Sequence, residues 1–425
     1  MTKQHLILRN LLSSIILLFI IIGIIHDGFS QAITQFVSIQ LSPARLISDF
    51  ISIAGIGGAL INSALVGLVG LVIILKLDVK LSGPTFAAVF TLMGFGLFGK
   101  TVLNIIPIIL GVYLSGKFVG KEFKEYIIIA LFGTALGPIV SLIAFEIGLT
   151  GVLGVITGIS LGIITGFFLP SLAVAMLHLH QGYNLYNMGL TCGFLGLFAA
   201  SFVKISGHKF VGQMAWYSEK STLLTLLIPV LSLFLIILGI IIDKKDSIKS
   251  FFKIQKIPGR LPSDFMDIES LAGTLINSGV IGIVGTLYTI IIGGDFNGPV
   301  IGGLLTIIGF SAFGTNLKNS WPVVFGVILC ALLFKLDLNS PGPILAAIFV
   351  TTLGPLAGEF GWKVGILAGF THLVMVMETG GWHGAINLYN NGFAGGLTAT
   401  IFVAVIQWYK TNKTEFKDTF RSKMK

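Results

Sequence analysis

Two short polar segments of similar composition stand out in this chain. The first runs from His180 to Gly189 and reads HQGYNLYNMG, and the second runs from His383 to Gly392 and reads HGAINLYNNG. Histidine, asparagine, leucine, tyrosine and glycine recur at matching positions in both. We call these segments the polar islands, because the sequence around each is almost entirely apolar.

The islands carry groups that could bind a polar solute. Amides and phenols both donate and accept hydrogen bonds, and neutral imidazole does the same. Such groups are costly to place in lipid, so a polar cluster inside a membrane is by default a candidate functional site. The alternative is that each island is a surface loop with its tyrosine in the interfacial belt. The duplication favours function, and we predict substrate binding by His180, Asn184, Tyr186, Asn187, His383, Asn387, Tyr389 and Asn390.

A second pair of polar residues also recurs. Asn62-Ser63 and Asn277-Ser278 each lie within a glycine-rich apolar stretch. These residues could contact a solute or a dehydrated cation, and we include Asn62 and Asn277 among the candidate binding residues. The alternative is that they form hydrogen bonds between helices, as polar residues in membrane helices often do.

Three acidic residues are candidates for ion coupling. Asp49 and Asp264 each follow a serine and precede an apolar run, a pattern typical of helix capping at a membrane face. Glu378 has no counterpart in the other half. If it is buried, its carboxylate would have a raised pKa and could carry a proton; a surface position fits the sequence equally well.

The histidines support a rival function. His178 and His180 form a His-x-His pair, and His383 matches the second of them. No third ligand follows at a recognisable spacing, so we predict neither a metal centre nor a cofactor. Duplicated islands also argue against an enzyme, whose catalytic groups rarely survive in two copies. The alternative is a membrane-embedded enzyme or assembly component that uses these three histidines.

The elements that position these residues must be membrane helices. The chain is 54% hydrophobic and 11% charged, with a mean hydropathy of +0.96. Apolar runs such as residues 223–242 exceed the roughly 18 residues that a spanning helix needs. The net charge of +9 lies in loops and in the tail, which indicates membrane orientation rather than nucleic-acid binding. Cys192 and Cys330 are far apart and indicate no disulfide.

The chain is built from an internal duplication. Residues 48–114 align with residues 263–329 at one constant offset, and the match resumes further on and ends in the islands. The shared residues are mainly the glycines, prolines and asparagines that bend, break or line helices. We divide the chain into an N-terminal helix and amphipathic stretch (1–47), repeat one (48–205), an unpaired helix and basic linker (206–262), repeat two (263–409) and a basic tail (410–425).

The basic segments predict the orientation of the two repeats. Excess lysine and arginine marks cytoplasmic segments, which places the linker and the C-terminal tail inside. The N-terminal segment, with Lys3 and Arg9 ahead of an apolar run, resembles a signal peptide, but we favour a retained first helix. The repeats then start on opposite faces, as in inverted-repeat transporters. We predict an all-α polytopic fold of about 12–14 spanning helices.

Gly-Pro pairs interrupt the apolar segments at Gly83-Pro84, Gly298-Pro299 and Gly342-Pro343. Because the first two occupy equivalent places in the two repeats, we favour broken or re-entrant helices there. Free N–H and carbonyl groups at such breaks can coordinate substrates and ions. The alternative is an ordinary loop just outside the lipid.

The duplicated Asn-Ser-x-x-x-Gly, Gly-Pro and Asn-Leu-Tyr-Asn-x-Gly motifs together resemble an uncharacterised family of two-repeat bacterial integral membrane proteins. The resemblance covers nearly the whole chain from Ser48 and implies no particular activity. The outline is also distantly similar to urea transporters, as in Asn62-Ser-Ala-Leu-Val-Gly67, although the Leu-Pro-x-x-Thr-x-Pro-Phe signature of that family is absent.

These observations predict a secondary transporter or facilitative pore in the bacterial inner membrane, with its C-terminus in the cytoplasm. The expected solute is small, polar, and uncharged or cationic, with sodium or proton coupling as an open alternative. Lipid is the expected surrounding, nucleic acid is not an expected partner, and the chain could form a homo-oligomer.

Overall fold

The computed structural model describes residues 3–148, 151–208, 210 and 214–423. Regular structure in this part of the chain is helical, apart from two isolated β-bridges, which confirms the predicted all-α class. Ten of the described helical segments are long and apolar enough to cross a membrane. Four further apolar helices have only 13 or 17 residues, so the expected 12–14 spans are reached only if these are counted.

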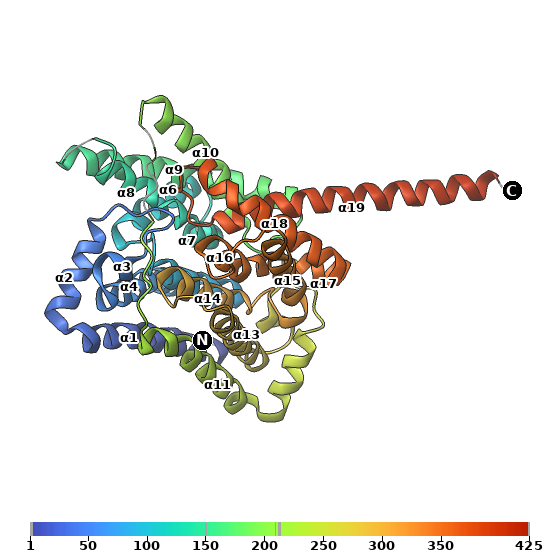
Figure 1. The fold of residues 1–425 in the computed structure, drawn as a ribbon, viewed down its shortest axis with the longest axis horizontal. Coiled ribbons are helices and arrows are strands. Elements are labelled where there is room, and N and C mark those ends of the chain that lie inside the picture. The colour runs from blue at the N-terminus through green and yellow to red at the C-terminus, as the bar shows by residue number, and fades with distance from the viewer. Residues whose placement is uncertain (1–2, 149–150, 209, 211–213, 424–425) are drawn as a thin grey trace.

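The first half of the chain lies on one side of the molecule in Figure 1, in blue to green. Glycine, proline and asparagine mark most of the breaks between its helices. These helices are α1 (Lys3–Asp27), α2 (Phe29–Gln40), α3 (Phe50–Ala54), α4 (Ile56–Lys76), α5 (Gly83–Phe95), α6 (Val102–Phe118), η1 (Phe123–Tyr126), α7 (Ile127–Gly133), η2 (Thr134–Leu136), α8 (Pro138–Phe145), α9 (Gly151–His180) and α10 (Asn187–Ile205).

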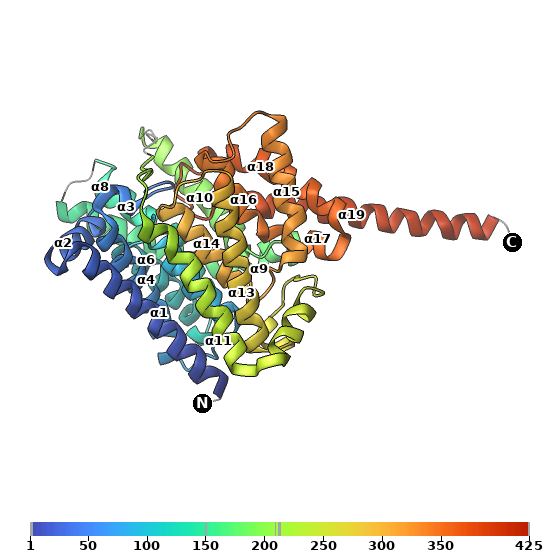
Figure 2. The same cartoon turned by 60° about the horizontal axis from the view of Figure 1, so that its bottom comes forward.

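The second half follows the same order of helices. Its last helix extends away from the body of the molecule toward the C-terminus (Figures 1 and 2). The helices are α11 (Thr222–Ile254), α12 (Phe265–Ile268), α13 (Leu271–Ile291), α14 (Gly298–Phe310), α15 (Leu317–Leu333), α16 (Pro341–Phe349), η3 (Val350–Leu353), α17 (Gly354–Phe360), α18 (Trp362–Trp382) and α19 (Asn390–Lys423).

The structural equivalence of the halves extends upstream of residues 48 and 263. Both α1 and α2 pack along α4, and α11 packs along α13. α11 is kinked at Asp243 and Lys244, so its two parts take the places of α1 and α2. The Gln40 amide donates to Asn62 Oδ1 at 2.8 Å, and the Gln255 amide donates to Asn277 Oδ1 at 3.0 Å. The helix at 223–242, which the sequence left unpaired, therefore corresponds to α1.

Sequence comparison missed this pairing for a physical reason. A lipid-facing helix needs only to stay apolar, so its residues diverge freely, whereas close contacts between helices constrain residue type. Gly58 packs against Gln35 of α2, and its counterpart Gly273 packs against Ser250 of α11. The glycines are retained in both halves, while their partners have changed.

The Gly-Pro pairs begin short helices at the centre of the fold. Pro84 and Pro299 occupy the first turns of α5 and α14, where the missing N–H of proline costs nothing. Each helix has 13 residues, about 20 Å at 1.5 Å per residue, which is too short for a hydrocarbon core of about 30 Å. Both are almost completely buried. They are therefore short, broken helices, in agreement with the prediction made from the Gly-Pro pairs.

The packing of these two short helices defines an inverted relation between the repeats. Gly83, at the start of α5, lies against the backbone of Ala312, just past the end of α14. At the other end, Gly94 lies against Gly302, and Gly298 against Leu97. α5 and α14 thus run antiparallel, side by side. The axis that exchanges them is perpendicular to both helices, as an inverted repeat requires.

Candidate functional site

Each polar island is a tight turn between two helices. The first lies between the end of α9 at His180 and the start of α10 at Asn187, and the second lies between α18 and α19. Gln181 and Gly182 have φ values of 51° and 83°, and Gly384 and Ala385 have 60° and 61°. Each island therefore reverses the direction of the chain sharply, with two residues in the left-handed backbone conformation at equivalent positions.

A histidine–asparagine pair closes each turn. His180 Nε2 lies 2.9 Å from Asn187 Oδ1, and His383 Nε2 lies 3.0 Å from Asn390 Oδ1. Both asparagine amides donate to carbonyls of the preceding helix, at Ala173 and Val376, over 3.1 Å each. These contacts hold the helix ends together, so most of the hydrogen-bonding capacity of the four side chains is used inside the protein.

The two islands converge. Asn184 Nδ2 donates to the Gly392 carbonyl at 3.1 Å, and Asn387 Nδ2 donates to the Gly189 carbonyl at 3.3 Å. The two glycines face each other, and a Cβ atom on Gly189 would lie 2.6 Å from the Cα of Gly392. The first turns of α10 and α19 therefore meet at the pseudo-two-fold axis, and only glycine permits this approach.

Asn62 and Asn277 serve as structural clamps. Asn62 donates to the carbonyls of Gly96 and Lys100, just after α5, at 2.6 and 2.8 Å. Asn277 does the same after α14, to the carbonyls of Ser311 and Thr315, at 2.8 and 2.9 Å. Both are fully buried, and each also accepts from a glutamine. This geometry matches the helix-bonding alternative, since both amides are satisfied by the protein.

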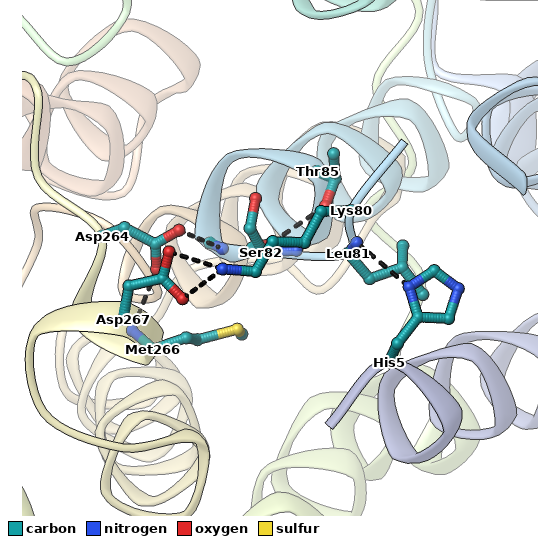
Figure 3. A network of polar contacts seen from close by, with 9 residues as sticks. His5, Lys80, Leu81, Ser82, Thr85, Asp264, Met266 and Asp267 are labelled. Atoms are coloured by element: carbon teal, nitrogen blue, oxygen red, sulfur yellow. Dashed lines mark hydrogen bonds and ion pairs between the residues drawn. The ribbon is translucent and has the colours of Figure 1, made fainter. Parts of the chain in front are cut away.

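Asp49 and Asp264 cap helices across the repeat boundary. Asp49 of repeat one accepts from the N–H of Gly298 at 3.2 Å, and Asp264 of repeat two accepts from the N–H of Gly83 at 3.0 Å. Figure 3 shows Asp264 directed at the start of α5, beside the Lys80–Asp267 ion pair. Each carboxylate thus stabilises the N-terminus of the other repeat's short helix.

Burial acts on both carboxyl groups, which lie outside the ten candidate spans. It raises the pKa of Asp49 to about 6, while backbone N–H groups of Tyr217, Ile51 and Gly298 act in the opposite direction. Burial likewise raises the pKa of Asp264, against the N–H of Gly83. Asp49 also caps its own short helix α3, which agrees with the capping pattern in the sequence.

The remaining candidates differ in their exposure. Glu378 is exposed on α18, and His178 is exposed near the end of α9, while His180 and His383 are buried. Among the residues that the structure describes, no group of three or more histidine, cysteine, aspartate or glutamate side chains is placed to hold a metal ion.

A cavity of about 990 Å³ lies between the islands and the short helices. Seven aromatic residues line the wall of the cavity, and six of them are equivalent between the repeats. Rings of one repeat pack against non-equivalent rings of the other: Tyr186 lies edge-on against Phe310 with ring centroids 4.3 Å apart, and Tyr389 lies edge-on against Phe95 at 4.6 Å. The equivalent pairs are Phe95 and Phe310, Phe132 and Phe349, and Tyr186 and Tyr389, and the seventh residue is Phe313.

Lys100 lies behind this wall and was not singled out from the sequence. It is fully buried, and its Nζ donates to the hydroxyl of Tyr389 at 2.6 Å. The ammonium also lies 4.6 Å from the Tyr389 ring centroid and 5.5 Å from that of Phe95. Its counterpart in repeat two is Thr315. The sequence does contain a signal that could have identified Lys100, because this lysine lies within an apolar, glycine-rich stretch. A lysine is rare in membrane segments unless it is functional.

The lining of the cavity differs between its two ends. It includes the segment from Arg260 to Asp264, where the basic linker ends and repeat two begins, which we call the linker end. The equivalent segment, Arg45 to Asp49, is absent from the described lining residues, and we call its location the far end. The sequence alone did not predict this asymmetry.

Specific contacts link the segments at the far end. Arg45 makes a two-pronged ion pair with Glu146, at 2.9 and 3.1 Å, with both side chains mostly buried. The segment before α11 adds two bonds: Trp216 Nε1 donates to Asp295 at 2.9 Å, and the Tyr217 N–H donates to Asp49 at 2.9 Å. At the linker end, Arg260 instead donates to the Gln181 carbonyl at 2.8 Å and is exposed.

Comparison with protein families identifies what kind of chain this is. A family described as proteins of unknown function (DUF1576) matches residues 29–205 and, separately, residues 243–408. The chain belongs to this family. The two matches begin near α2 and at the α11 kink, which agrees with the equivalence of these elements and with the predicted two-repeat organisation.

Comparison with curated proteins and with solved structures finds no match. The distant similarity to urea transporters therefore has no support beyond the motif from which it was drawn. The supported description is a polytopic, two-repeat membrane protein of this family.

Proposed function

We propose that this protein is a secondary transporter that moves a small solute by exposing its central cavity alternately to the two membrane faces. The observation that carries this proposal is that the two repeats are equivalent, whereas the two ends of the cavity between them differ. Equivalent residues of two inverted repeats surround one cavity, whose lining includes the linker end but not the far end. We interpret this difference as an open linker end and a closed far end. Exchanging the conformations of the two repeats would close the first end and open the second.

The converging islands support the same proposal. They place the first turns of α10 and α19 against the cavity, and residues of both islands line it. Surface loops would instead lie apart on separate faces. The islands then act mainly as the rigid junction of the repeats, with Tyr186 and Tyr389 presented to the solute.

The basic linker supports an orientation for this transporter. Its lysines, with Arg260, favour the cytoplasmic side, so the conformation described here would be inward-open, in a bacterial inner membrane. A permanently open pore is the competing transport mechanism, and the sealed far end speaks against it.

Accessibility of a cavity residue from each face tests alternating access. Thr306 lines the cavity and is buried, so we would place Thr306→Cys in a Cys192→Ala/Cys330→Ala background. Membrane-impermeant maleimide applied to oriented vesicles should label this cysteine quickly from the linker face and slowly from the far face. Addition of Arg45→Ala should accelerate labelling from the far face.

A cysteine at Glu219, which is exposed in the segment before α11, provides the control for sidedness. Glu219→Cys should react from the far face only, whether or not Arg45 is replaced. If Thr306→Cys never reacts from the far face, even with Arg45→Ala, the cavity does not alternate and the proposal is wrong.

A further inference from the structure

The charge balance of the central cavity points to a class of solute. Among the described residues that line the cavity, Asp264 is the single acidic one. It lies at the linker end, where its carboxylate already accepts from the N–H groups of Gly83 and Met266. The deeper wall carries hydrogen-bond donors, and the amino group of Lys100 lies directly behind it.

Lys100 acts on the cavity through Tyr389. The ammonium donates to the phenolic oxygen at 2.6 Å, and this oxygen thereby serves as an acceptor. A hydroxyl can accept and donate at once, so the phenolic proton remains for a ligand. Among the described residues, no carboxylate lies within ion-pair distance of Lys100, and burial without a counter-charge lowers the pKa of this lysine well below its usual range, since a desolvated cation is costly. An anion beside Tyr389 would offset that cost.

Two further donors come from neighbouring elements. His372 is fully buried, and its Nε2 lies 3.1 Å from Asn391 Oδ1. Asn391 lines the cavity, and because its oxygen is engaged, its NH₂ group is left for a ligand. Thr91 also lines the cavity; it is 1% exposed, and its hydroxyl has no hydrogen-bond partner in the described structure.

In the opposite repeat, Tyr186 takes the place of Tyr389, and its buried hydroxyl has no hydrogen-bond partner in the described structure. However, Thr315 takes the place of Lys100. Met188 takes the place of Asn391, and the Thr306 hydroxyl donates within its own helix to Gly302 at 2.8 Å. The donors therefore differ between the two sides of an otherwise symmetric cavity, which would orient an asymmetric ligand. The first turns of α10 and α19 add the positive ends of two helix dipoles to the same region.

The aromatic walls complete the picture of the ligand. Seven phenylalanine and tyrosine rings line the cavity, and they favour a flat or branched apolar body. A simple inorganic ion would leave these surfaces uncovered.

We propose that the cavity binds an organic monocarboxylate with an aromatic or branched apolar body. Its carboxylate meets Tyr389, held by Lys100, together with the donors of Asn391 and Thr91. This inference rests on the proposed transport function and names its solute class. It replaces the neutral or cationic solute expected from the sequence, because that expectation considered the asparagines but not Lys100.

Paired probes separate charge from shape. The thermal unfolding midpoint of the purified full-length protein would be titrated with benzoate, phenylacetate and 3-methylbutanoate, each against its primary amide. We expect at least one carboxylate to bind about tenfold or more tightly than its amide, since charge-assisted hydrogen bonds are about twice as strong as neutral ones. In Lys100→Met this preference should disappear, and in Lys100→Arg it should be partly retained.

Lys363→Met is the matched control, because Lys363 is exposed at the start of α18 and should leave the preference unchanged. If Lys100→Met does not fold, Asn391→Ala provides the second test and should weaken carboxylate binding selectively. The inference is overturned if no carboxylate of the panel binds, if amides bind equally well, or if the preference survives in the folded variants.

The outcome can be distinguished from failure of the transport proposal. Labelling of Thr306→Cys from the two faces does not depend on the charge of the solute. Alternating labelling without carboxylate preference would leave a transporter of another solute class, whereas carboxylate binding without alternation would leave a binding site in a fixed structure.

Discussion

Arg45 and Arg260 occupy equivalent positions in the two repeats but make different contacts. Arg45 is buried against Glu146 at the far end. Arg260 is exposed, and its guanidinium carbon lies 4.4 Å from the centroid of the Tyr183 ring. The residues that build the core of the repeats, by contrast, make nearly the same contacts in both. The comparison shows that the centre of the fold is symmetric while its two ends are not.

This difference locates the mobile and the rigid parts of the molecule. The Asn62 and Asn277 clamps, the capping aspartates and the island glycines are duplicated with matching geometry, as expected for a framework that persists in both conformations. Asymmetry concentrates in the segments that flank the cavity, where two conformations of one sequence motif are needed.

The largest expected effect comes from disturbing the symmetric centre. In Gly189→Ala the new methyl group would meet the backbone of Gly392 at 2.6 Å, and backbone cannot yield as a side chain does. We expect a loss of stability at or above the upper end of the roughly 1–3 kcal/mol typical of overpacking, seen as a much lower unfolding midpoint in detergent. Gly381→Ala, where nothing lies within 4 Å of the new atom, should be neutral or slightly stabilising.

The second prediction tests whether the clamps are equivalent. Asn62→Ala and Asn277→Ala each leave two carbonyl acceptors without this donor, at roughly 1–3 kcal/mol for each group left unsatisfied. The two variants should lower the unfolding midpoint by similar amounts. Asn412→Ala, which loses only an exposed bond to the Trp408 carbonyl, should change it little. A large difference between the first two would mean that the halves are not energetically equivalent.

A third prediction concerns the two arginines. Arg45→Ala should favour the conformation with an open far end by about 2 kcal/mol, a value between those typical of exposed and of buried ion pairs. This free energy corresponds to a change of about 30-fold in the ratio of the open to the closed conformation. Arg260→Ala should shift this ratio far less. The measurement is the labelling rate of Thr306→Cys from each face, and equal shifts in both variants would contradict the proposed closure by Arg45.

The smallest effect is expected at Glu378. Because this side chain is exposed on α18, Glu378→Gln should change stability by no more than about 0.5 kcal/mol and leave solute binding unchanged. Loss of ion-dependent transport in this variant would instead return Glu378 to the candidate coupling residues.

The sequence predicted the architecture better than the chemistry. Duplicated Gly-Pro and asparagine motifs were enough to predict two repeats with broken helices, because backbone approach and helix breaks tolerate few residue types. The basic linker and tail added the prediction that the repeats are inverted. The same constraint made Asn62 and Asn277 conspicuous, although the structure uses their amides for packing. Recurrence in both halves thus identified the framework rather than the ligand-facing groups.

Residues without a counterpart were harder to interpret. Lys100, His372 and Asn391 occur in one repeat only, so a search for repeated motifs passes over them. Their significance depends on burial and on which rings surround them, neither of which is visible in a linear chain. The paired aromatics were hidden for another reason, since phenylalanine is frequent throughout this sequence.

The exchange of capping aspartates between the repeats has a consequence for biosynthesis. The start of α5 is held by Asp264, which is translated some 180 residues after Gly83. At about 5–20 residues per second, the first short helix waits roughly 10–40 seconds for its cap. During this interval repeat one must remain in the membrane or its insertion machinery as an incomplete unit, and its final burial requires the second half. Neither half can therefore complete its short helix as an independent folding unit, and a chain truncated before residue 264 is expected to be a substrate for membrane quality control.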